Sequence, residues 1–132
     1  MTGFQASNAT IDLSVPTQPG TISVQSIFCW IIVQENNGDD SFDWMLPWAD
    51  YKAGFGSLGS NYWLGLERLH LLTSVQPYRL RVEVKQLSDG RWFSAEYWSF
   101  QIGDETTDQY RLDISGYTEN AGNSLLYNAS LR

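Results

Sequence analysis

The stretch FDWMLPWADYKAGFG (residues 42–56), followed by YWLGLERLHLLT (residues 62–73), decides how this chain folds. It holds three of the six tryptophans, Trp44, Trp48 and Trp63. Large aromatic side chains bury much apolar area each and dominate the energetics of a protein core. We therefore expect the core to form around these three indoles.

Two short helices are predicted within this stretch. Pro47 suits the first helical position, where its missing N–H would have no partner. The side chains of Trp48, Tyr51 and Phe55 then follow on one helical face. Gly54 and Gly56 end the helix, because glycine tolerates the positive φ of a C-terminal cap.

The second helix is expected to begin after Ser60 or Asn61, either of which is a good N-cap residue. One face of it carries Leu66, Leu69, His70 and Thr73. Two short helices, each with an aromatic anchor nearby, must pack on something larger.

The larger partner is predicted to be an antiparallel sheet. Tyr78–Lys85 alternates apolar and charged residues, as a half-buried strand does, and Ser88-Asp89-Gly90 is a hairpin turn signal. The returning strand, Arg91–Ile102, changes parity near Trp98, which predicts a β-bulge there. A third strand is expected over residues 110–115.

The remaining segments give weaker strand predictions. Thr21–Gln34 is rich in Ile, Val, Phe and Trp and predicts a long strand. The alternation of Ile11, Leu13 and Val15 predicts a short edge strand. Gly116–Asn123 is expected to be a loop, and Leu125–Leu131 is expected to begin one more strand.

The motif residues also resemble the fibrinogen C-terminal-like domain, over roughly Trp30–Tyr127. On this resemblance, residues 1–20 do not match the family and residues 21–132 form a partial domain. The implied fold is α+β, a twisted antiparallel sheet with two short helices in an incomplete fibrinogen C-terminal-like domain. The motif residues are Trp30, Asp43, Trp44, Trp48, Tyr51, Gly54, Phe55, Gly56, Trp63, Gly65 and Gly122.

The resemblance implies a secreted, non-catalytic recognition or adhesion module, of the lectin-like kind used in innate immunity and cell adhesion. The implied partners are glycans, protein ligands such as receptors, or other fibrinogen-like subunits. In that family the calcium loop, a second disulfide and the main ligand pocket follow the last motif. We therefore expect a truncated domain with no cofactor, no metal ligands and no catalytic residues. The alternative is an assembly fragment without lectin activity.

The family's first cysteine would fall at Thr21, so the corresponding disulfide is not expected. Cys29 is the one cysteine in the chain and cannot make an internal disulfide. The sequons at Asn8 and Asn128 are possible N-glycosylation sites in a secreted protein. The start of the chain, residues 1–6, has neither the basic region nor the apolar run of a signal peptide.

The net charge of −7 disfavours nucleic acid and anionic membranes as partners. No apolar run reaches the length of a membrane span. The chain is 42% hydrophobic and 14% aromatic over 132 residues, which fits a single domain with a real core.

The chain has one histidine and one cysteine, and their sequence contexts favour a structural role for each. His70 is the one histidine, and on an apolar helix face we expect its tautomer to be held by a local hydrogen bond. Cys29 lies between two aromatic residues, where a buried thiol is inert. The enzyme alternative requires a cleft that gathers His70 with two carboxylates.

Three groups of residues have both a binding and a structural interpretation. Two acidic clusters could hold a cation or could be solvated turns and helix starts. An aromatic group on one strand could be a sugar-binding platform or sheet packing, and we favour packing. The acidic clusters are Asp39, Asp40, Asp43 and Asp104, Glu105, Asp108, and the aromatic group is Trp92, Phe93, Tyr97 and Trp98.

An intracellular or assembly-type interaction protein is the remaining alternative. Such a protein would use the sheet surface that the missing part of the domain would otherwise cover, and a large exposed apolar patch would favour it. On the same ground we expect the chain to form oligomers or to aggregate.

Overall fold

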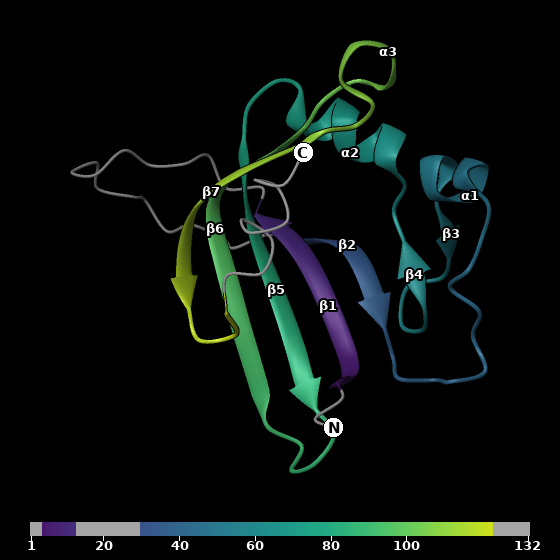
Figure 1. The fold of residues 1–132 in the computed structure, drawn as a ribbon, viewed down its shortest axis with the longest axis vertical. Helices are drawn as coiled ribbons and strands as arrows, with labels where there is room; N and C mark the ends of the chain where they lie inside the picture. The colour runs from purple at the N-terminus through teal and green to yellow at the C-terminus, as the bar shows by residue number, and fades with distance from the viewer. Residues whose placement is uncertain (1–3, 13–29, 123–132) are drawn as a thin grey trace.

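A computed structural model of the chain describes residues 4–12 and 30–122. They form one antiparallel sheet of seven strands, with three helices (Figure 1). The strands are β1 (Phe4–Asp12), β2 (Trp30–Asn36), β3 (Phe55–Gly56), β4 (Tyr62–Trp63), β5 (Tyr78–Gln86), β6 (Trp92–Ile102) and β7 (Leu112–Glu119). The helices are α1 (Trp48–Ala53), α2 (Leu66–Thr73) and α3 (Glu105–Asp108). The predicted α+β class is confirmed.

The strand order is β3-β4-β2-β1-β5-β6-β7, which places β1 in the interior of the sheet. The prediction of an edge strand around Ile11 is therefore wrong. Ile11 pairs with Ile31 of β2 on one side and with Leu80 of β5 on the other, and it is fully buried. Residues 13–29 lie outside the described part of the chain, so the predicted long strand is described from Trp30 onward.

The predicted hairpin of β5 and β6 is confirmed, and so is its bulge. Tyr78 pairs with Phe100, but Leu80 pairs with Tyr97, so β6 holds one extra residue at Trp98–Ser99. The extra residue lets Tyr97 and Phe100 both face the core. The parity change in the sequence has this geometry as its cause.

The third strand runs further than predicted. β7 continues to Glu119, where a loop was expected from Gly116. Gly116, with φ +73, lies opposite the bulge in β6, and β7 keeps its pairing with β6 on both sides of this glycine. The further strand predicted from Leu125 lies outside the described residues.

Both helix starts differ from the predictions. Pro47 is the N-cap of α1 and lies outside the helix, while Phe55 belongs to β3 and not to the helix. The N-cap of α2 is Gly65, with φ 107, and not Ser60 or Asn61. Asn61 is buried, and its Oδ1 accepts a hydrogen bond from the N–H of Asn37 at 3.1 Å, so its capping capacity is used to hold a distant loop.

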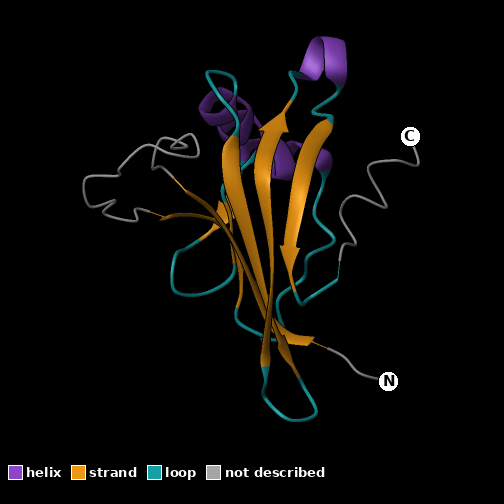
Figure 2. Ribbon diagram, turned by 90° about the vertical axis from the view of Figure 1, so that its left-hand side faces the viewer, coloured by secondary structure: helices purple, strands orange, loops and turns teal. Residues whose placement is uncertain are grey.

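The helices gather at one end of the sheet (Figure 2). The core lies between the sheet and α2, which contributes Leu69 and Thr73. The buried apolar residues are Ile11, Val33, Leu69, Leu80, Ala95, Tyr97, Phe100, Ile102, Tyr110 and Ile114. No helix of the described segments is long and apolar enough to cross a membrane.

Thr73 connects α2 to the sheet through its hydroxyl group. The hydroxyl donates to the carbonyl of Leu69 at 2.8 Å and accepts from the N–H of Ile102 at 3.0 Å. The residue is fully buried, so neither backbone group has water as a substitute partner.

We predict that Thr73→Val lowers the free energy of unfolding by about 1–3 kcal/mol, because it leaves the buried N–H of Ile102 without an acceptor. Urea denaturation measures the loss, and amide exchange at Ile102 should accelerate. Thr73→Ser is the control, since it keeps the hydroxyl and should keep Ile102 protected. Equal exchange at Ile102 in both variants would contradict this role.

Candidate functional site

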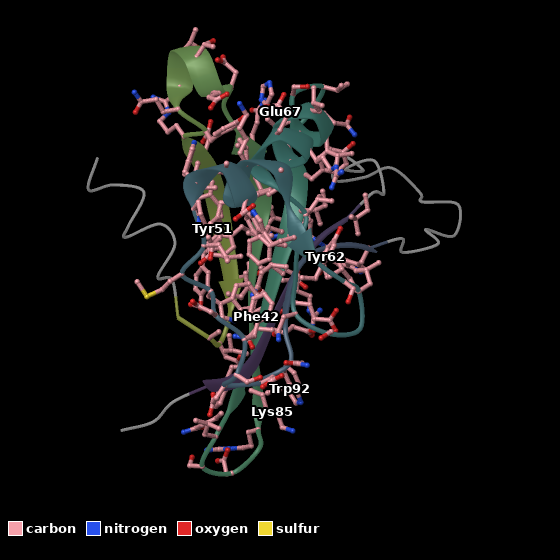
Figure 3. All side chains as sticks on the ribbon, turned by 90° about the vertical axis from the view of Figure 1, so that its right-hand side faces the viewer. Phe42, Tyr51, Tyr62, Glu67, Lys85 and Trp92 are labelled. Carbon is pink, nitrogen blue, oxygen red and sulfur yellow. The ribbon has the colours of Figure 1, made fainter. Side chains whose placement is uncertain are left out.

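The motif stretch builds an aromatic cluster beside β3 and β4. The rings of Phe42 and Trp44 lie 5.0 Å apart, and that of Trp44 lies 5.7 Å from Phe55. Tyr51 joins Phe55 at 5.1 Å and Trp63 at 6.1 Å. Figure 3 shows Tyr51 just beneath α1, with Phe42 further down the sheet. These residues, which we call the aromatic cluster, are half-buried and form a small second core.

Two hydrogen bonds fix the polar ends of this cluster. The hydroxyl of Tyr51 donates to the carbonyl of Trp44 at 2.5 Å, and the indole N–H of Trp63 donates to the carbonyl of Tyr51 at 2.7 Å. Buried tyrosine and tryptophan need such partners. Trp44 and Trp63 therefore pack as predicted, but neither belongs to the buried core, and Trp63 packs against its edge.

The motif glycines let backbone segments touch. A Cβ on Gly54 would lie 2.4 Å from the carbonyl oxygen of Leu64, and one on Gly65 would lie 2.7 Å from the carbonyl carbon of Ala53. A Cβ on Gly56 would lie 2.0 Å from the carbonyl oxygen of Asn61. No side chain fits at these positions, so the end of α1 and the start of α2 are held in direct contact.

Trp48 does not join the cluster, and the prediction that it lies in the core is wrong. Its side chain is 57% exposed. It points from α1 toward Tyr110, whose ring centroid lies 6.1 Å away at a tilt of 46°. The reason is that α1 has only six residues, so Phe55 lies beyond its end and does not extend the face that carries Trp48.

Tyr110 joins the three helices beneath Trp48. Its hydroxyl donates to a carboxylate oxygen of Glu67 on α2 at 2.5 Å, while Lys52 of α1 forms an ion pair with Glu105 of α3. Burial, the hydrogen bond to Glu67 and the nearby carboxylates raise the pKa of Tyr110 well above its ordinary value. The phenol therefore remains a neutral donor. We call Trp48, Lys52, Glu67, Glu105 and Tyr110 the helix-end surface.

A second aromatic group lies on the face of the sheet away from α2. The guanidinium of Arg79 lies 5.0 Å from the ring centroid of Trp30 and 5.1 Å from that of Trp98. Glu96 lies beside it, with Oε1 3.0 Å from Arg81 and Oε2 3.8 Å from Arg79. We call Trp30, Arg79, Arg81, Glu96 and Trp98 the outer face.

The predicted aromatic group of β6 is divided between the two faces. Tyr97 is buried, and its ring packs on that of Tyr117 with the centroids 5.6 Å apart at a tilt of 50°, as the packing interpretation expects. Trp92 and Trp98 are 51% and 58% exposed on the other face, so the prediction that they lie in the core is wrong. Their rings still pack across the strands, Trp92 on Lys85 and Trp98 on Arg79 of β5, as the cross-strand part of the packing interpretation expects. Trp92 lies near Lys85 at the end of the hairpin furthest from the helices (Figure 3).

The remaining candidates have structural partners. His70 Nδ1 lies 3.0 Å from the carbonyl oxygen of Ile102, so the ring is held by a hydrogen bond as expected, but the partner belongs to β6 and is not local in the sequence. Asp39 and Asp43 accept backbone N–H groups two residues further on, as turn residues do. No group of three His, Cys, Asp or Glu side chains able to hold a metal ion occurs in residues 4–12 and 30–122.

Asp104 caps α3 and is not drawn into a cluster. Its carboxylate accepts from the hydroxyl and the N–H of Thr107 and from the hydroxyl of Thr106. These hydrogen bonds, that of the Thr107 side chain above all, hold the pKa of Asp104 well below its usual range. The carboxylate thus begins the short helix that carries Glu105 to Lys52.

The last motif residue, Gly122, and the first sequon, at Asn8, both lie in or beside the sheet. The N–H of Gly122 donates to the hydroxyl of Tyr117 at 2.9 Å, which ties the end of the described chain to β7. Asn8 lies in β1, at the register position opposite Glu83 of β5. Cys29 and Asn128 lie outside the described residues.

Comparison with known families matches residues 25–131 to the C-terminal globular domain of fibrinogen beta and gamma chains. The chain is 38% identical over 98 residues to Angiopoietin-related protein 1 of Bos taurus, which covers 74% of this chain and 19% of that protein. It is 40% identical over 103 residues to Protein scabrous of Drosophila melanogaster, covering 78% of this chain and 12% of that protein. The chain thus spans about a fifth or less of these relatives.

Among solved structures, the fold is similar to the fibrinogen-like globe domain of human ANGPTL2. The two superpose with a TM-score of 0.70 at 36% sequence identity. The match covers 79% of this chain and 47% of that chain.

We predict that Gly54→Ala lowers the free energy of unfolding by about 3 kcal/mol or more, because its Cβ meets backbone atoms at a positive φ. Gly59→Ala is the control. Gly59 also has a positive φ, but nothing lies within 4 Å of its Cβ position, so the loss should be about 1 kcal/mol. Urea denaturation compares the two, and equal losses would contradict the backbone contact.

We predict that Tyr110→Phe lowers the free energy of unfolding by about 1–2 kcal/mol at neutral pH. Because the folded pKa is raised, the contribution of this phenol is complete below about pH 10 and is lost as pH rises further. Stability of the wild type and of Tyr110→Phe, measured against pH, should therefore converge in strong alkali. Ionisation of Tyr110 together with the exposed tyrosines would contradict this account.

Proposed function

The chain belongs to the family of fibrinogen C-terminal globular domains, and on that premise we propose that it is a non-catalytic extracellular recognition module. The observation that carries the proposal is the exposed indole of Trp48 on a rigid support. We propose that this helix-end surface contacts a protein ligand.

The helix-end surface has the composition of an interface centre with a charged rim. Trp48 is 57% exposed, and Tyr110 supports one side of its ring. Tryptophan and tyrosine are enriched at the centre of protein interfaces, where a few residues supply most of the binding energy. Lys52 and Glu105 form an ion pair beside it that is partly open to solvent. Met45, three residues before Trp48 in the chain, is 90% exposed.

Rigidity also favours binding. Three helices hold the support of Trp48 through the Tyr110–Glu67 hydrogen bond and the Lys52–Glu105 ion pair. A side chain that is already ordered loses little conformational entropy when a partner arrives. The helix-end surface is therefore prepared for association before the ligand binds.

Proposals on ligand class follow from the family. A protein ligand fits the helix-end surface best, and a glycan is the second class of ligand that we propose for it. The alternative is an assembly fragment without lectin activity. Self-association through the exposed apolar side chains belongs to that alternative.

The proposal that catalysis is absent has support from the roles of the polar groups. His70 is bonded to the carbonyl of Ile102, and the carboxylates of Glu67 and Asp104 are engaged in helix contacts. A general base needs a partner in a substrate cleft, and these side chains are used to hold backbone and helices instead.

Domain limits and modification sites remain proposals as well. We propose that residues 21–132 form the partial family domain and that residues 1–20 lie outside the family pattern, although β1 contributes a strand to the sheet. We also propose glycosylation at Asn8 and Asn128 when the chain is secreted.

We predict that Trp48→Ala weakens binding of the chain to its ligand in an array of purified extracellular proteins and glycans by about tenfold or more. The control is Trp92→Ala, which removes a similarly exposed indole from the far end of the hairpin and should leave the same binding unchanged. Unchanged binding by Trp48→Ala would rule out the helix-end surface, and no binding to any protein or glycan of the array would support the assembly alternative.

We predict that calcium chelation leaves the melting temperature and the array binding of this chain unchanged, because residues 4–12 and 30–122 hold no group of three His, Cys, Asp or Glu side chains able to bind a metal ion. Thermal unfolding with millimolar calcium and with excess chelator measures this. A rise of several degrees with calcium would contradict the proposal.

A further inference from the structure

The strand β1 fills an interior position of the sheet, although it lies outside the range that matches the fibrinogen family. That match covers residues 25–131, whereas β1 is Phe4–Asp12. Figure 1 shows β1 between β2 and β5. Its pairing with β2 runs from Ser7 to Asp12, and its pairing with β5 runs along its whole length. Within the described residues, the matched part of the sheet therefore has a gap one strand wide, which β1 fills.

The strands β2 and β5 do not pair with each other. Each is antiparallel to β1, so the two run parallel to one another on either side of it. Neighbouring strands lie about 4.8 Å apart, so strands that flank a third are separated by about twice that distance and cannot share hydrogen bonds. Their backbone groups that face β1 need an extended segment between them. We call the two facing backbone edges, of Trp30–Asn36 and Tyr78–Gln86, the strand slot.

Backbone pairing holds β1 in the strand slot, with one large side chain as its anchor. Of the three side chains that are described, those of Ala9, Thr10 and Ile11, only Ile11 is fully buried. It lies between Ile31 on β2 and Leu80 on β5. In strand addition, main-chain hydrogen bonds supply affinity and side-chain pockets supply specificity. The strand slot therefore accepts an extended segment that places an aliphatic side chain at this position.

The connection between β1 and β2 is long for two neighbouring antiparallel strands. Residues 13–29 separate them, which is 29 − 13 + 1 = 17 residues, whereas a β-hairpin loop usually has about two to five. Seventeen extended residues span up to roughly 55 Å. The radius of gyration expected for a folded chain of this size is about 14 Å. The connection is thus long enough for β1 to reach the strand slot of a neighbouring copy.

We propose that the strand slot takes β1 of a second copy, so that two chains associate by reciprocal strand exchange. This occupant fits because it has the same sequence and the same register, with its Ile11 between Ile31 and Leu80 of the other copy. Exchange of an identical element keeps the contacts of the single chain, which makes it a low-cost route to a dimer. A flexible tether gives β1 an effective concentration on the order of millimolar at its own slot, so exchange competes when copies reach that concentration.

Disulfide trapping between two variants tests this inference. Both carry Cys29→Ser, so that each introduced thiol is the only one in its chain. Asn8 of β1 lies opposite Glu83 of β5, and directly opposed Cβ atoms lie about 5 Å apart, within reach of a disulfide after a small adjustment. Asn8→Cys and Glu83→Cys chains are mixed at about 1 mM in a glutathione redox buffer. We expect a disulfide-linked heterodimer whose yield falls on dilution.

Two controls separate exchange from collision. Ser115→Cys, on the edge strand β7, replaces Glu83→Cys at an exposed position away from the strand slot and should link to Asn8→Cys about tenfold less. Asn8→Cys and Glu83→Cys in one chain should close an internal disulfide that locks β1 in its own slot. In sedimentation at about 1 mM, this locked chain should remain a monomer while the Cys29→Ser chain forms dimers.

Three results would overturn the inference. The first is equal linkage of Asn8→Cys to Glu83→Cys and to Ser115→Cys, which would show collision and not exchange. The second is a locked chain that dimerises as strongly as the Cys29→Ser chain. The third is failure of the internal disulfide to form, which would show that β1 does not occupy this register. None of them bears on the proposed role of Trp48, which lies on α1, outside the strand slot.

Discussion

The backbone of Gly54 lies against the backbone of Leu64 and Gly65, and the placement of the helices depends on this contact. It brings the end of α1 to the start of α2 with no side chain between them. The aromatic cluster then closes over the joint, and the N–H of Leu64 donates to the carbonyl of Val33 at 2.8 Å, which ties the joint to β2. The glycine contact thus joins the two helices, and the hydrogen bond from Leu64 to Val33 connects the joint to the sheet.

Both candidate surfaces follow from that arrangement. Because α1 ends at Ala53 and does not reach Phe55, Trp48 faces Tyr110 and leaves half of its ring in solvent. On the opposite side, the bulge of β6 serves the core and the surface together, since it returns Phe100 to the interior and leaves Trp98 outside. In both places an exposed indole is the consequence of a backbone feature that the core requires.

Local patterns in the sequence predicted what depends on neighbouring residues. Alternation over Tyr78–Lys85 and its change near Trp98 were sufficient for the hairpin and its bulge, because a strand's period is local. The patterns failed to predict the structure where it depends on a residue distant in the sequence. Asn61 looks like an N-cap but holds the N–H of Asn37 instead, and Ile11 looks like part of an edge strand but pairs on both sides. The exposure of Trp48 could not be predicted, because Tyr110 lies 62 positions away in the chain.

Amide hydrogen exchange at Leu64 tests the central claim most directly. If the glycine contact and the aromatic cluster hold the motif segment on the sheet, the N–H of Leu64 should exchange as slowly as that of Leu80 in the buried strand β5, through global unfolding only. Exchange at Leu64 that is orders of magnitude faster than at Leu80 would show a segment that opens by itself and would contradict the account.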